Sequence, residues 1–455
     1  MGQITRAKQT AWHVALIATI AAAIRLPIWL TRVHQTFDEG VFLASNDLVA
    51  AGHTPFQEVF SSQGPLFLPL LRFGQWLSFE DPRGARTMMI VAAIGFTVAF
   101  YFIARVYLIP NVALAASLLV ASSGVGVLAA GPVQSEGLAL ALGMSSIAIL
   151  IRSHRRWAPL AAGIAIGAAI AVKSLHVLPL LTVVVVLLLR RQGLKALIVA
   201  GSAAVATVLT VSFPFGLMRV WDQYVLFHLA KDNTIPFWEN LAQGATGLSG
   251  YDLPLLAAVV TALWYRWFVP HPQTRSLESP AWLPTLWLLG TVVLFTVFTP
   301  IGSGFTRALV YLIPPLLLTV APRVEVSNRA LATLVLAVIM WQVGTVGFIA
   351  GRDPDPEQEA VIQLLESVPS EGLIVTDDPG LAWASGRRSH PTTVDPSLAR
   401  FDTGYLTVAD IETALDDPAS CAFVAFSGRF EGRSIRVPAD YGATAINGVL
   451  VRSGC

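Results

Sequence analysis

The sequence predicts a polytopic α-helical membrane protein with a small α/β domain at its C-terminus. Its 455 residues are 54% hydrophobic and only 13% charged, about half the charged fraction of a typical soluble domain. Apolar runs of about 18–20 residues recur along the chain, and each is long enough to cross a bilayer. Residues 352–455 instead combine short strand-like runs, such as "GLIVTDD" and "CAFVAF", with a helical pattern, which is typical of a soluble α/β domain.

About eleven transmembrane helices are expected from these apolar runs. The first run, from Ala11, has no clear small-residue cleavage site, so we interpret it as a retained helix and not as a signal peptide. The predicted ranges are 11–31, 85–106, 111–131, 134–151, 157–173, 175–190, 195–215, 252–269, 282–299, 304–321 and 329–350.

The short loops set the orientation of these helices. Basic loops at 152–157, 190–195, 265–275 and 321–329 all fall on the side of the N-terminus, and Lys and Arg in short loops mark the cytoplasm. We therefore predict a multi-pass protein of the inner or plasma membrane. Its domains are residues 1–351, a membrane domain that includes the extracytoplasmic loop 32–84, and residues 352–455, an extracytoplasmic α/β domain.

Composition and motifs exclude several kinds of function. The net charge is +1 and gives no basic face for nucleic acid. No GxxxxGK[ST], HExxH or GxSxG motif is present, so nucleotide hydrolysis, zinc proteolysis and serine hydrolysis have no motif support. Cys421 and Cys455 lack metal-ligand spacing. They could form a disulfide or remain two unpaired thiols, and the sequence leaves both alternatives open.

Ionisable residues gather near the predicted outer ends of the helices. Such groups are costly beside a bilayer and are candidates for function, although solvated or snorkelling side chains explain single cases equally well. Acids with cations suit a reaction that needs a general base and a clamp for an anionic leaving group. A sugar carried on a polyprenyl phosphate fits this pattern. The acids are Asp38, Glu39, Glu58 and Glu136, and the basic residues are Lys173, His176 and Arg307.

Three stretches of the chain carry a family resemblance. The first, "FDEGVFLASNDLVAAGHTPFQEVFSSQGPL", contains the Asp38-Glu39 pair; the second, "GIAIGAAIAVKSLHVLPL", contains Lys173; and the third, "RALVYLIPPLLLTV", contains Arg307 and Tyr311. As an ordered set they resemble the C-type (GT-C) membrane glycosyltransferases. Within that family, the chain resembles the branch of protein O-mannosyltransferases and bacterial aminoarabinose transferases, and it looks like a bacterial member. The resemblance covers most of the membrane part.

The resemblance implies roles for the acids. Asp38 would be the catalytic general base, and Glu39 would support it or bind the acceptor. Glu58 and Glu136 stand where relatives place acids that line the cavity, sometimes at a metal. No cofactor is therefore certain, and a divalent metal ion with Glu58 and Glu136 as candidate ligands is left open.

The resemblance also implies a donor site. Lys173 and Arg307 would contact the donor phosphate, and Tyr311 belongs to the same late motif. His176 is a further substrate-binding candidate, although a histidine at a helix end is the simpler interpretation. The chain departs from the family at Gln63-Gly64, where relatives usually carry a lysine before the Pro-Leu step.

The function expected from these features is sugar transfer, with inversion, from a polyprenyl-phosphate donor in the bilayer to an extracytoplasmic hydroxyl of a glycan, lipid or protein. The alternative is a polytopic lipid or sugar transporter or flippase without transferase activity. A transporter would show inverted repeats and helices broken at mid-membrane, and no repeat is found. Outside the site, we expect His34 and His53 at the loop surface and Asp377-Asp378 in a strand-end turn.

Overall fold

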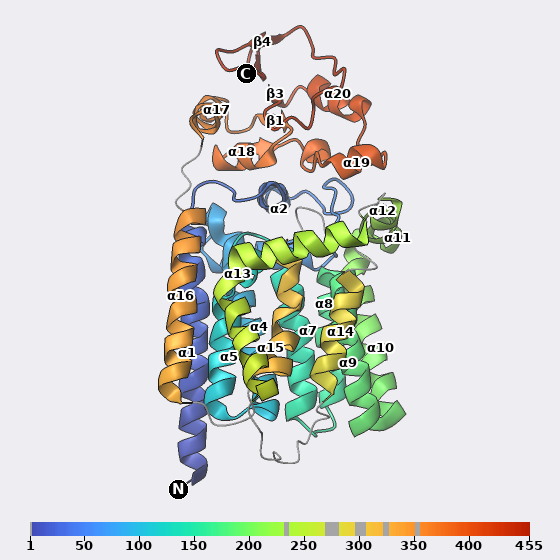
Figure 1. The fold of residues 1–455 in the computed structure, drawn as a ribbon. Helices are drawn as coiled ribbons and strands as arrows, with labels where there is room; N and C mark the ends of the chain where they lie inside the picture. The colour runs from blue at the N-terminus through green and yellow to red at the C-terminus, as the bar shows by residue number, and fades with distance from the viewer. Residues whose placement is uncertain (1, 232–235, 269–281, 296–305, 322–326, 351–354) are drawn as a thin grey trace. The chain divides into compact units, whose positions relative to one another are not determined.

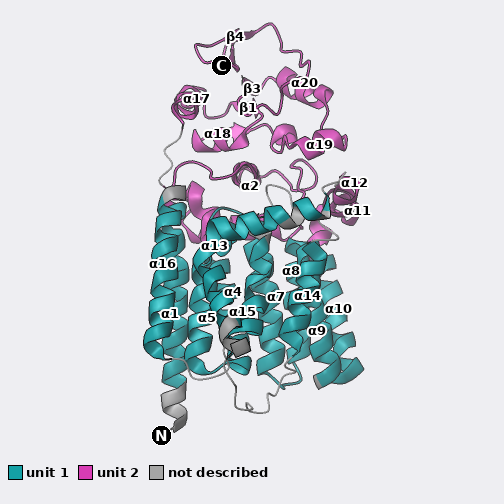
Figure 2. Cartoon of the chain, in the orientation of Figure 1, with its two compact units in different colours: residues 1–29, 89–210, 233–349 teal, residues 30–88, 211–232, 350–455 magenta. Residues whose placement is uncertain are grey.

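The computed structural model describes the whole chain except residues 1, 232–235, 269–281, 296–305, 322–326 and 351–354. Its contacts divide the described residues into two compact units, coloured separately in Figure 2. Unit 1 comprises residues 1–29, 89–210 and 233–349, and unit 2 comprises residues 30–88, 211–232 and 350–455. Each unit thus draws on distant parts of the sequence. The domains predicted from the sequence meet at residue 351, where the membrane domain is expected to end and the extracytoplasmic domain to begin. The two units are defined by contacts alone and do not test that boundary.

Unit 1 is built from apolar helices that run side by side (Figure 1). Their buried positions are mainly Ala, Val, Leu and Ile, and the small residues among them let helices pack closely. The elements are α1 (Gly2–Leu30), α4 (Ala85–Tyr107), α5 (Pro110–Ser122), α6 (Gly124–Ala130), α7 (Ser135–Arg152), α8 (Ala158–Val172), α9 (Ser174–Arg191), α10 (Gly193–Ser212), α13 (Phe237–Phe268), α14 (Leu283–Val293), η5 (Thr306–Tyr311), α15 (Ile313–Val320) and α16 (Asn328–Ala350).

Six of the described helices are long and apolar enough to cross a membrane, and α5 with α6 forms a pair bent by 57° that raises the number to seven. Four further apolar helices are shorter, at Ala158–Val172, Ser174–Arg190, Leu283–Val293 and Leu309–Val320. The predicted polytopic helical fold is confirmed, and each of the eleven predicted ranges overlaps an apolar helix. The number of crossings, expected to be about eleven, is not confirmed.

Two buried charged residues hold the break between α5 and α6. Arg25, 1% exposed, donates to backbone carbonyls on both sides of the break, each at 2.9 Å. Asp252, at a kink inside α13, accepts hydrogen bonds from the backbone N–H groups of Gly124 and Val125 at 2.7 and 2.9 Å. A broken helix leaves backbone groups without helical partners, and such groups need partners inside a bundle. These two side chains supply them.

Unit 2 joins the loop after the first helix to the C-terminal residues. The loop contributes α2 (Phe37–Ala50), α3 (Phe67–Leu77) and η1 (Pro82–Gly84). Residues 211–232 add η2 (Phe213–Phe215), α11 (Leu217–Trp221), the π-helical turn η3 (Asp222–Leu226) and α12 (Phe227–Ala230). The C-terminal helices are α17 (Pro356–Glu366), α18 (Pro379–Ala384), η6 (Pro391–Thr393), α19 (Leu398–Asp402) and α20 (Val408–Asp416).

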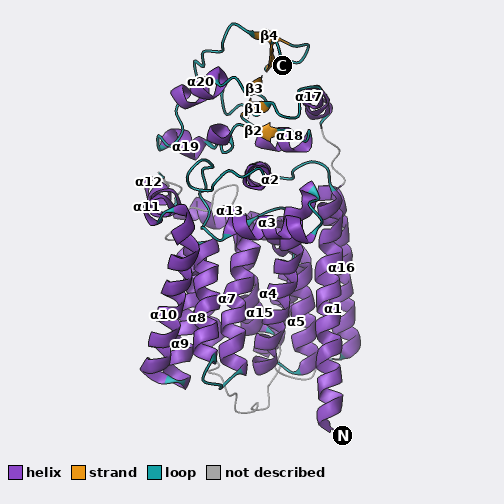
Figure 3. Cartoon of the chain, turned by 180° about the vertical axis from the view of Figure 1, so that it is seen from behind, coloured by secondary structure: helices purple, strands orange, loops and turns teal. Residues whose placement is uncertain are grey.

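The strands form one sheet in the C-terminal residues (Figure 3). They are β1 (Leu373–Thr376), β2 (Arg388–Ser389), β3 (Ser420–Val424), β4 (Tyr441–Ala443) and β5 (Val449–Arg452), in the order β2-β1-β3-β5-β4. β1 pairs in parallel with β2 and β3, while β5 pairs antiparallel with β3 and β4. The predicted strands at "GLIVTDD" and "CAFVAF" are therefore confirmed as β1 and β3.

Apolar residues cover both faces of this sheet. One cluster gathers residues of α17 and α18 around Ile374 and Ala422, and the other gathers residues of α20 around Val375 and Phe423. Successive strand residues point to opposite faces, so neighbouring residues enter different clusters. Cys421 and Cys455 form a disulfide, which decides between the two states that the sequence leaves open.

Within unit 2, α2 and α18 touch through glycines. A Cβ added to Gly40 would lie 2.9 Å from the Cα of Gly380, and one added to Gly380 would overlap the ring of His34. Real side chains do not tolerate such approaches, so both positions require glycine. This contact fixes the start of α2, which carries Asp38 and Glu39, against the C-terminal residues.

Candidate functional site

The predicted Asp-Glu pair lies in the first turn of α2. The helix begins after Thr36, whose hydroxyl accepts a hydrogen bond from the backbone N–H of Glu39 at 3.2 Å. Acids are stabilised in a first turn by the partial positive charge of the helix N-terminus. The two carboxylates nevertheless differ in surroundings, because Glu39 is fully buried whereas Asp38 is partly exposed.

Glu39 is held in an ion pair with Arg86. Its Oε1 lies 2.8 Å from Nε of Arg86, and both side chains are 0% exposed. The other carboxylate oxygen accepts the N–H of Gln35 at 2.6 Å, while Arg86 donates to the carbonyls of Thr31 and Val33 at 2.6 and 2.9 Å. Glu39 and Arg86 therefore fix the chain that leads into α2. This geometry suits the supporting role expected for Glu39, and Arg86 is a partner that sequence reasoning missed.

Asp38 has C-terminal residues of unit 2 in its surroundings. The guanidinium of Arg429 lies 3.4 Å from the ring centroid of Phe37, the residue before Asp38. Burial raises the pKa of Asp395, and the negative charge of Asp38 raises it further, against the lowering effect of Arg400. Asp395 and Arg429 were missed because no motif marks either one, and only the fold brings them near the start of α2.

His34 connects the loop to α18. Its Nε2 lies 3.2 Å from Oδ1 of Asp378, and the side chains are 10% and 9% exposed. The prediction that His34 lies at the loop surface is wrong, because α2 packs against α18 and covers it. The strand-end turn predicted at Asp377-Asp378 is confirmed: Asp378 caps α18 by accepting the N–H of Gly380 at 3.1 Å.

Glu58 shapes a turn in the loop. Its carboxylate accepts the backbone N–H of Thr54 at 2.8 Å and lies 3.4 Å from Nδ1 of His53. The hydrogen bond from Thr54 and the neighbouring His53 lower the pKa of this carboxyl. Phe56, between them, has a φ of 63°, so the turn is tight. The substrate or metal role expected for Glu58 stays a prediction.

In unit 1, four of the predicted residues lie together, three of them at the ends of α7, α8 and α9 and the fourth, Tyr311, at the end of η5. Nζ of Lys173 donates to Oε1 of Glu136 at 2.8 Å, and these side chains are 20% and 3% exposed. Tyr311 donates from its hydroxyl to the carbonyl of Glu136 at 3.1 Å. The His176 ring lies 5.6 Å from the Tyr311 ring, centroid to centroid. Glu136, Lys173, Tyr311 and His176 therefore lie together in unit 1, and their role in binding a substrate stays a prediction.

Sequence position explains why they meet. Glu136 lies in the first turn of α7, Lys173 joins α8 to α9, and His176 lies in the first turn of α9. Antiparallel neighbours joined by short connections bring the start of α7 and the start of α9 to the same end of the bundle. The side chain of Arg307 lies outside the described residues, so its predicted role stays a prediction.

The two groups of residues differ in what they can do. In unit 1, a largely buried ammonium group beside a carboxylate offers a cation that an anionic phosphate can engage. In unit 2, Asp38 offers a partly exposed carboxylate on a fixed helix start, which suits a general base. Whether the two groups line one chamber is a prediction about both units together.

A metal ion at these acids has limited support. Within the described part of the chain, no three His, Cys, Asp or Glu side chains gather as metal ligands would. Glu58 is occupied by its turn and Glu136 by Lys173. The metal role expected for Glu58 and Glu136 stays a prediction.

The helical bundle, the loop helix after α1 and the small C-terminal sheet together define a multi-pass membrane protein with the C-type glycosyltransferase fold. Solved structures confirm this class. ArnT from Cupriavidus metallidurans, in a crystal structure bound to undecaprenyl phosphate, is similar with a TM-score of 0.69 and 14% identity, over 97% of this chain and 98% of ArnT. Its apo structure is similar with a TM-score of 0.65 and 14% identity, over 92% and 94%.

The likeness to ArnT covers both units and extends over nearly the full length of each chain, and it confirms the fold expected from the three motifs. No protein-family model and no curated protein sequence matched the chain. This chain and ArnT therefore share an arrangement of helices, and at 14% identity the comparison shows the fold alone.

Proposed function

We propose that this chain is an integral-membrane glycosyltransferase. It moves a hexosyl or pentosyl group from a polyprenyl-phosphate donor to an acceptor hydroxyl on the extracytoplasmic side. The observation that carries the proposal is the ArnT-like fold over 97% of the chain, in a relative crystallised with undecaprenyl phosphate, together with Asp38 at the start of the first loop helix. A lipid-linked donor also explains why the polar residues lie on membrane helices.

Asp38 acts as the general base. Its carboxylate takes the proton of the acceptor hydroxyl as the oxygen bonds to the anomeric carbon of the sugar. The bond from that carbon to the phosphate oxygen breaks on the opposite face, so the product is inverted and polyprenyl phosphate leaves. Phosphate is a good leaving group, and the site mainly has to position two substrates and balance charge. Glu39 and Arg86 keep the start of α2 fixed for this purpose.

Lys173 receives the donor phosphate. Its ammonium lies against Glu136, and a phosphate with more negative charge competes for the same donor hydrogens. Arg307 is proposed as the second cation, with His176 and Tyr311 beside the site. No step is assigned to a metal ion, because the described acids do not gather as ligands.

The site and the C-terminal residues are proposed to face the extracytoplasmic side. The basic loops predicted to be cytoplasmic support this orientation. The Cys421–Cys455 disulfide supports it independently, since disulfides persist in oxidising compartments. The donor would then lie in the bilayer with its sugar outside.

Donor profiling with purified full-length protein in lipid nanodiscs tests the proposal. Radiolabelled undecaprenyl-phosphate sugars are offered singly, and transfer to water or to added acceptors is counted. Asp38→Asn should reduce turnover by about 100-fold or more while donor binding stays unchanged. Lys173→Gln should weaken donor binding by about tenfold.

Two results would contradict the proposal. Wild-type turnover in Asp38→Asn would remove Asp38 as the base. Failure of the wild-type protein with every donor, combined with uptake or flipping of labelled lipid in vesicles, would favour the transporter or flippase instead.

A further inference from the structure

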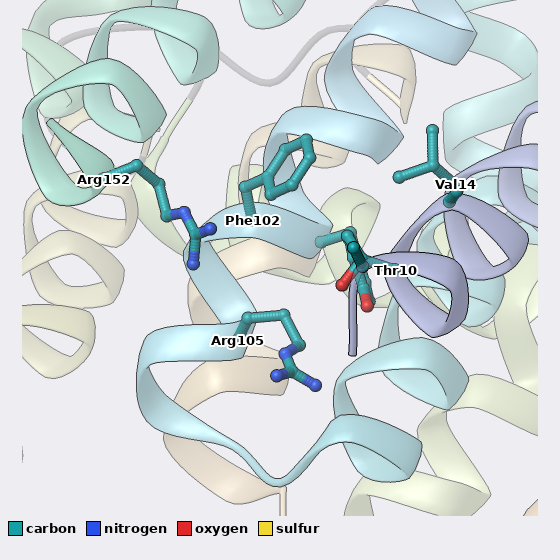
Figure 4. A pocket seen from close by; sticks show the side chains of 8 residues that line it. Thr10, Val14, Phe102, Arg105 and Arg152 are labelled. Carbon is teal, nitrogen blue, oxygen red and sulfur yellow. The ribbon is translucent and has the colours of Figure 1, made fainter. Parts of the chain in front are cut away.

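A second site lies in unit 1, away from Glu136 and Lys173. It is a pocket of about 550 Å³ between α1, α4 and α7. Thr10 and Val14 of α1, Phe102 and Arg105 of α4, and Arg152 of α7 line it (Figure 4). We call these five residues the basic pocket.

The basic pocket lies at the end of the bundle opposite Glu136. Glu136 is in the first turn of α7 and Arg152 is its last residue. Sixteen residues of α-helix separate them, or about 24 Å at 1.5 Å per residue. The pocket is therefore no extension of the proposed donor site.

Positive charge in the basic pocket has no acidic counterpart among the described lining residues. The neighbouring sequence is also poor in acidic residues. Residues 1–30 contain no Asp or Glu, and between residues 82 and 221 only Glu136 is acidic. Two guanidinium groups held near each other without a carboxylate repel one another, and an anion placed between them removes that repulsion. Each guanidinium presents a planar fork of donors that matches phosphate oxygens.

The rest of the basic pocket is apolar. Phe102 lies under the guanidinium of Arg152, 5.6 Å from ring centroid to Cζ, and Val14 and two alanines of α1 line the α1 side. Figure 4 shows the side chains of Arg152 and Arg105 on one side of the pocket and those of Thr10 and Val14 of α1 on the other. A pocket with cations at one end and an apolar wall along a membrane helix matches an amphiphile with an anionic head.

The position of the basic pocket agrees with the headgroup level of one membrane leaflet. It lies near the N-terminal end of α1, at the end of the bundle where the loops after α4, α7 and α9 turn (Figure 1). Trp12, next to it on α1, is 65% exposed, and tryptophan is typical of the headgroup level. Basic residues are also concentrated at this end, at 152–156 and 190–195, which the positive-inside rule assigns to the cytoplasm.

We propose that the basic pocket binds the phosphate of an anionic phospholipid from the cytoplasmic leaflet. Arg105 and Arg152 hold the phosphate oxygens, and an acyl chain runs along the apolar wall of α1. Because the three helices each contribute a lining residue, the lipid ties α1 to α4 and α7. A ligand that binds only the folded state stabilises it, so this lipid stabilises the packing of the first helix.

The test uses purified full-length protein in nanodiscs of phosphatidylcholine, with phosphatidylglycerol added in steps. Native mass spectrometry counts retained lipids, and thermal unfolding reports stabilisation. Arg152→Gln should lower the apparent affinity for phosphatidylglycerol by about fivefold, since each Arg near the surface contributes about that factor. Arg155→Gln is the matched control: Arg155 is exposed like Arg152, carries the same charge and does not line the pocket.

Each outcome decides the proposal. A loss in Arg152→Gln with none in Arg155→Gln supports it, whereas equal losses in both variants show a diffuse surface effect and overturn it. Stabilisation by inorganic phosphate alone, equal to that by phosphatidylglycerol, would show a free-phosphate site and overturn the lipid assignment. If Arg152→Gln does not fold, Ala11→Phe narrows the pocket from its apolar side with both arginines intact. That variant should also lose phosphatidylglycerol, and unchanged binding in it would contradict the proposal.

Discussion

At the scale of single residues, His34 gives unit 2 a dependence on pH. Burial disfavours its charged form, but the hydrogen bond and charge of Asp378, with the charge of Glu39, outweigh burial and the opposing Arg86, and the pKa of His34 is raised. A raised pKa means that the folded state holds the proton more tightly than the unfolded state does. The stabilisation is therefore complete below the unfolded pKa of about 6.5 and declines as the pH rises through the folded pKa.

Thermal unfolding of the detergent-solubilised protein across pH 5–9 measures this effect. The wild-type midpoint should fall as the pH rises above about 6.5, and His34→Gln should remove that slope. His53→Gln is the control, because His53 lies in an exposed pair with Glu58. The same slope in wild type and His34→Gln would mean that other groups cause the pH dependence.

Residue roles could be predicted only in part. The adjacent acids Asp38 and Glu39 mark the candidate site, yet their sequence does not say which one is buried. That difference arises from Arg86, which reaches Glu39 from 47 positions away. Glu136, Lys173 and His176 were expected near the outer ends of their helices, because helix topology alone brings those ends together, whereas Tyr311 was expected only from its motif. Asp395 and Arg429 depend on loop paths that carry no periodic pattern.

At the scale of elements, the break between α5 and α6 depends on Asp252. Its carboxylate accepts the first N–H groups of α6, and loss of such a cap costs about 1–2 kcal/mol. Asp252→Ala should lower the free energy of unfolding by about that amount, since buried amides would lose their acceptor. Titration with a denaturing detergent measures it. Glu239→Ala, an exposed acid on the same helix, should change the free energy by less than about 0.5 kcal/mol.

The hydropathy of the segment that forms α5 and α6 explains why this break was not predicted. Residues 111–131 form one continuous apolar run, and a hydropathy pattern measures length and composition without showing where a helix bends. The bend at Ser123 comes from partners far away in the chain, Arg25 and Asp252. If Asp252→Ala kept full stability, the carboxylate would not be what holds the bend.

At the scale of the whole molecule, the sequence predicts which segments are apolar and which are polar, but it does not predict which segments pack together. Composition correctly distinguishes the helical bundle from the C-terminal sheet. It does not reveal that residues 30–88 and 211–232 pack with residues 350–455, because such grouping depends on contacts such as Gly40 with Gly380 and the hydroxyl of Tyr405 with Asp222 at 2.9 Å.

The orientation of the whole molecule can be tested through its two cysteines. Cys421 and Cys455 are the only cysteines in the chain, so labelled thiols can be counted by gel shift. If the C-terminal residues are exported, acid-trapped and denatured protein should label only after reduction, because the disulfide forms outside the cytosol. Cys455→Ser should expose one thiol and, with loss of a bridge across 34 residues, destabilise the full-length protein by roughly 3–4 kcal/mol. Two reactive thiols in unreduced wild-type protein would place the C-terminal residues in the cytosol and reverse the proposed topology.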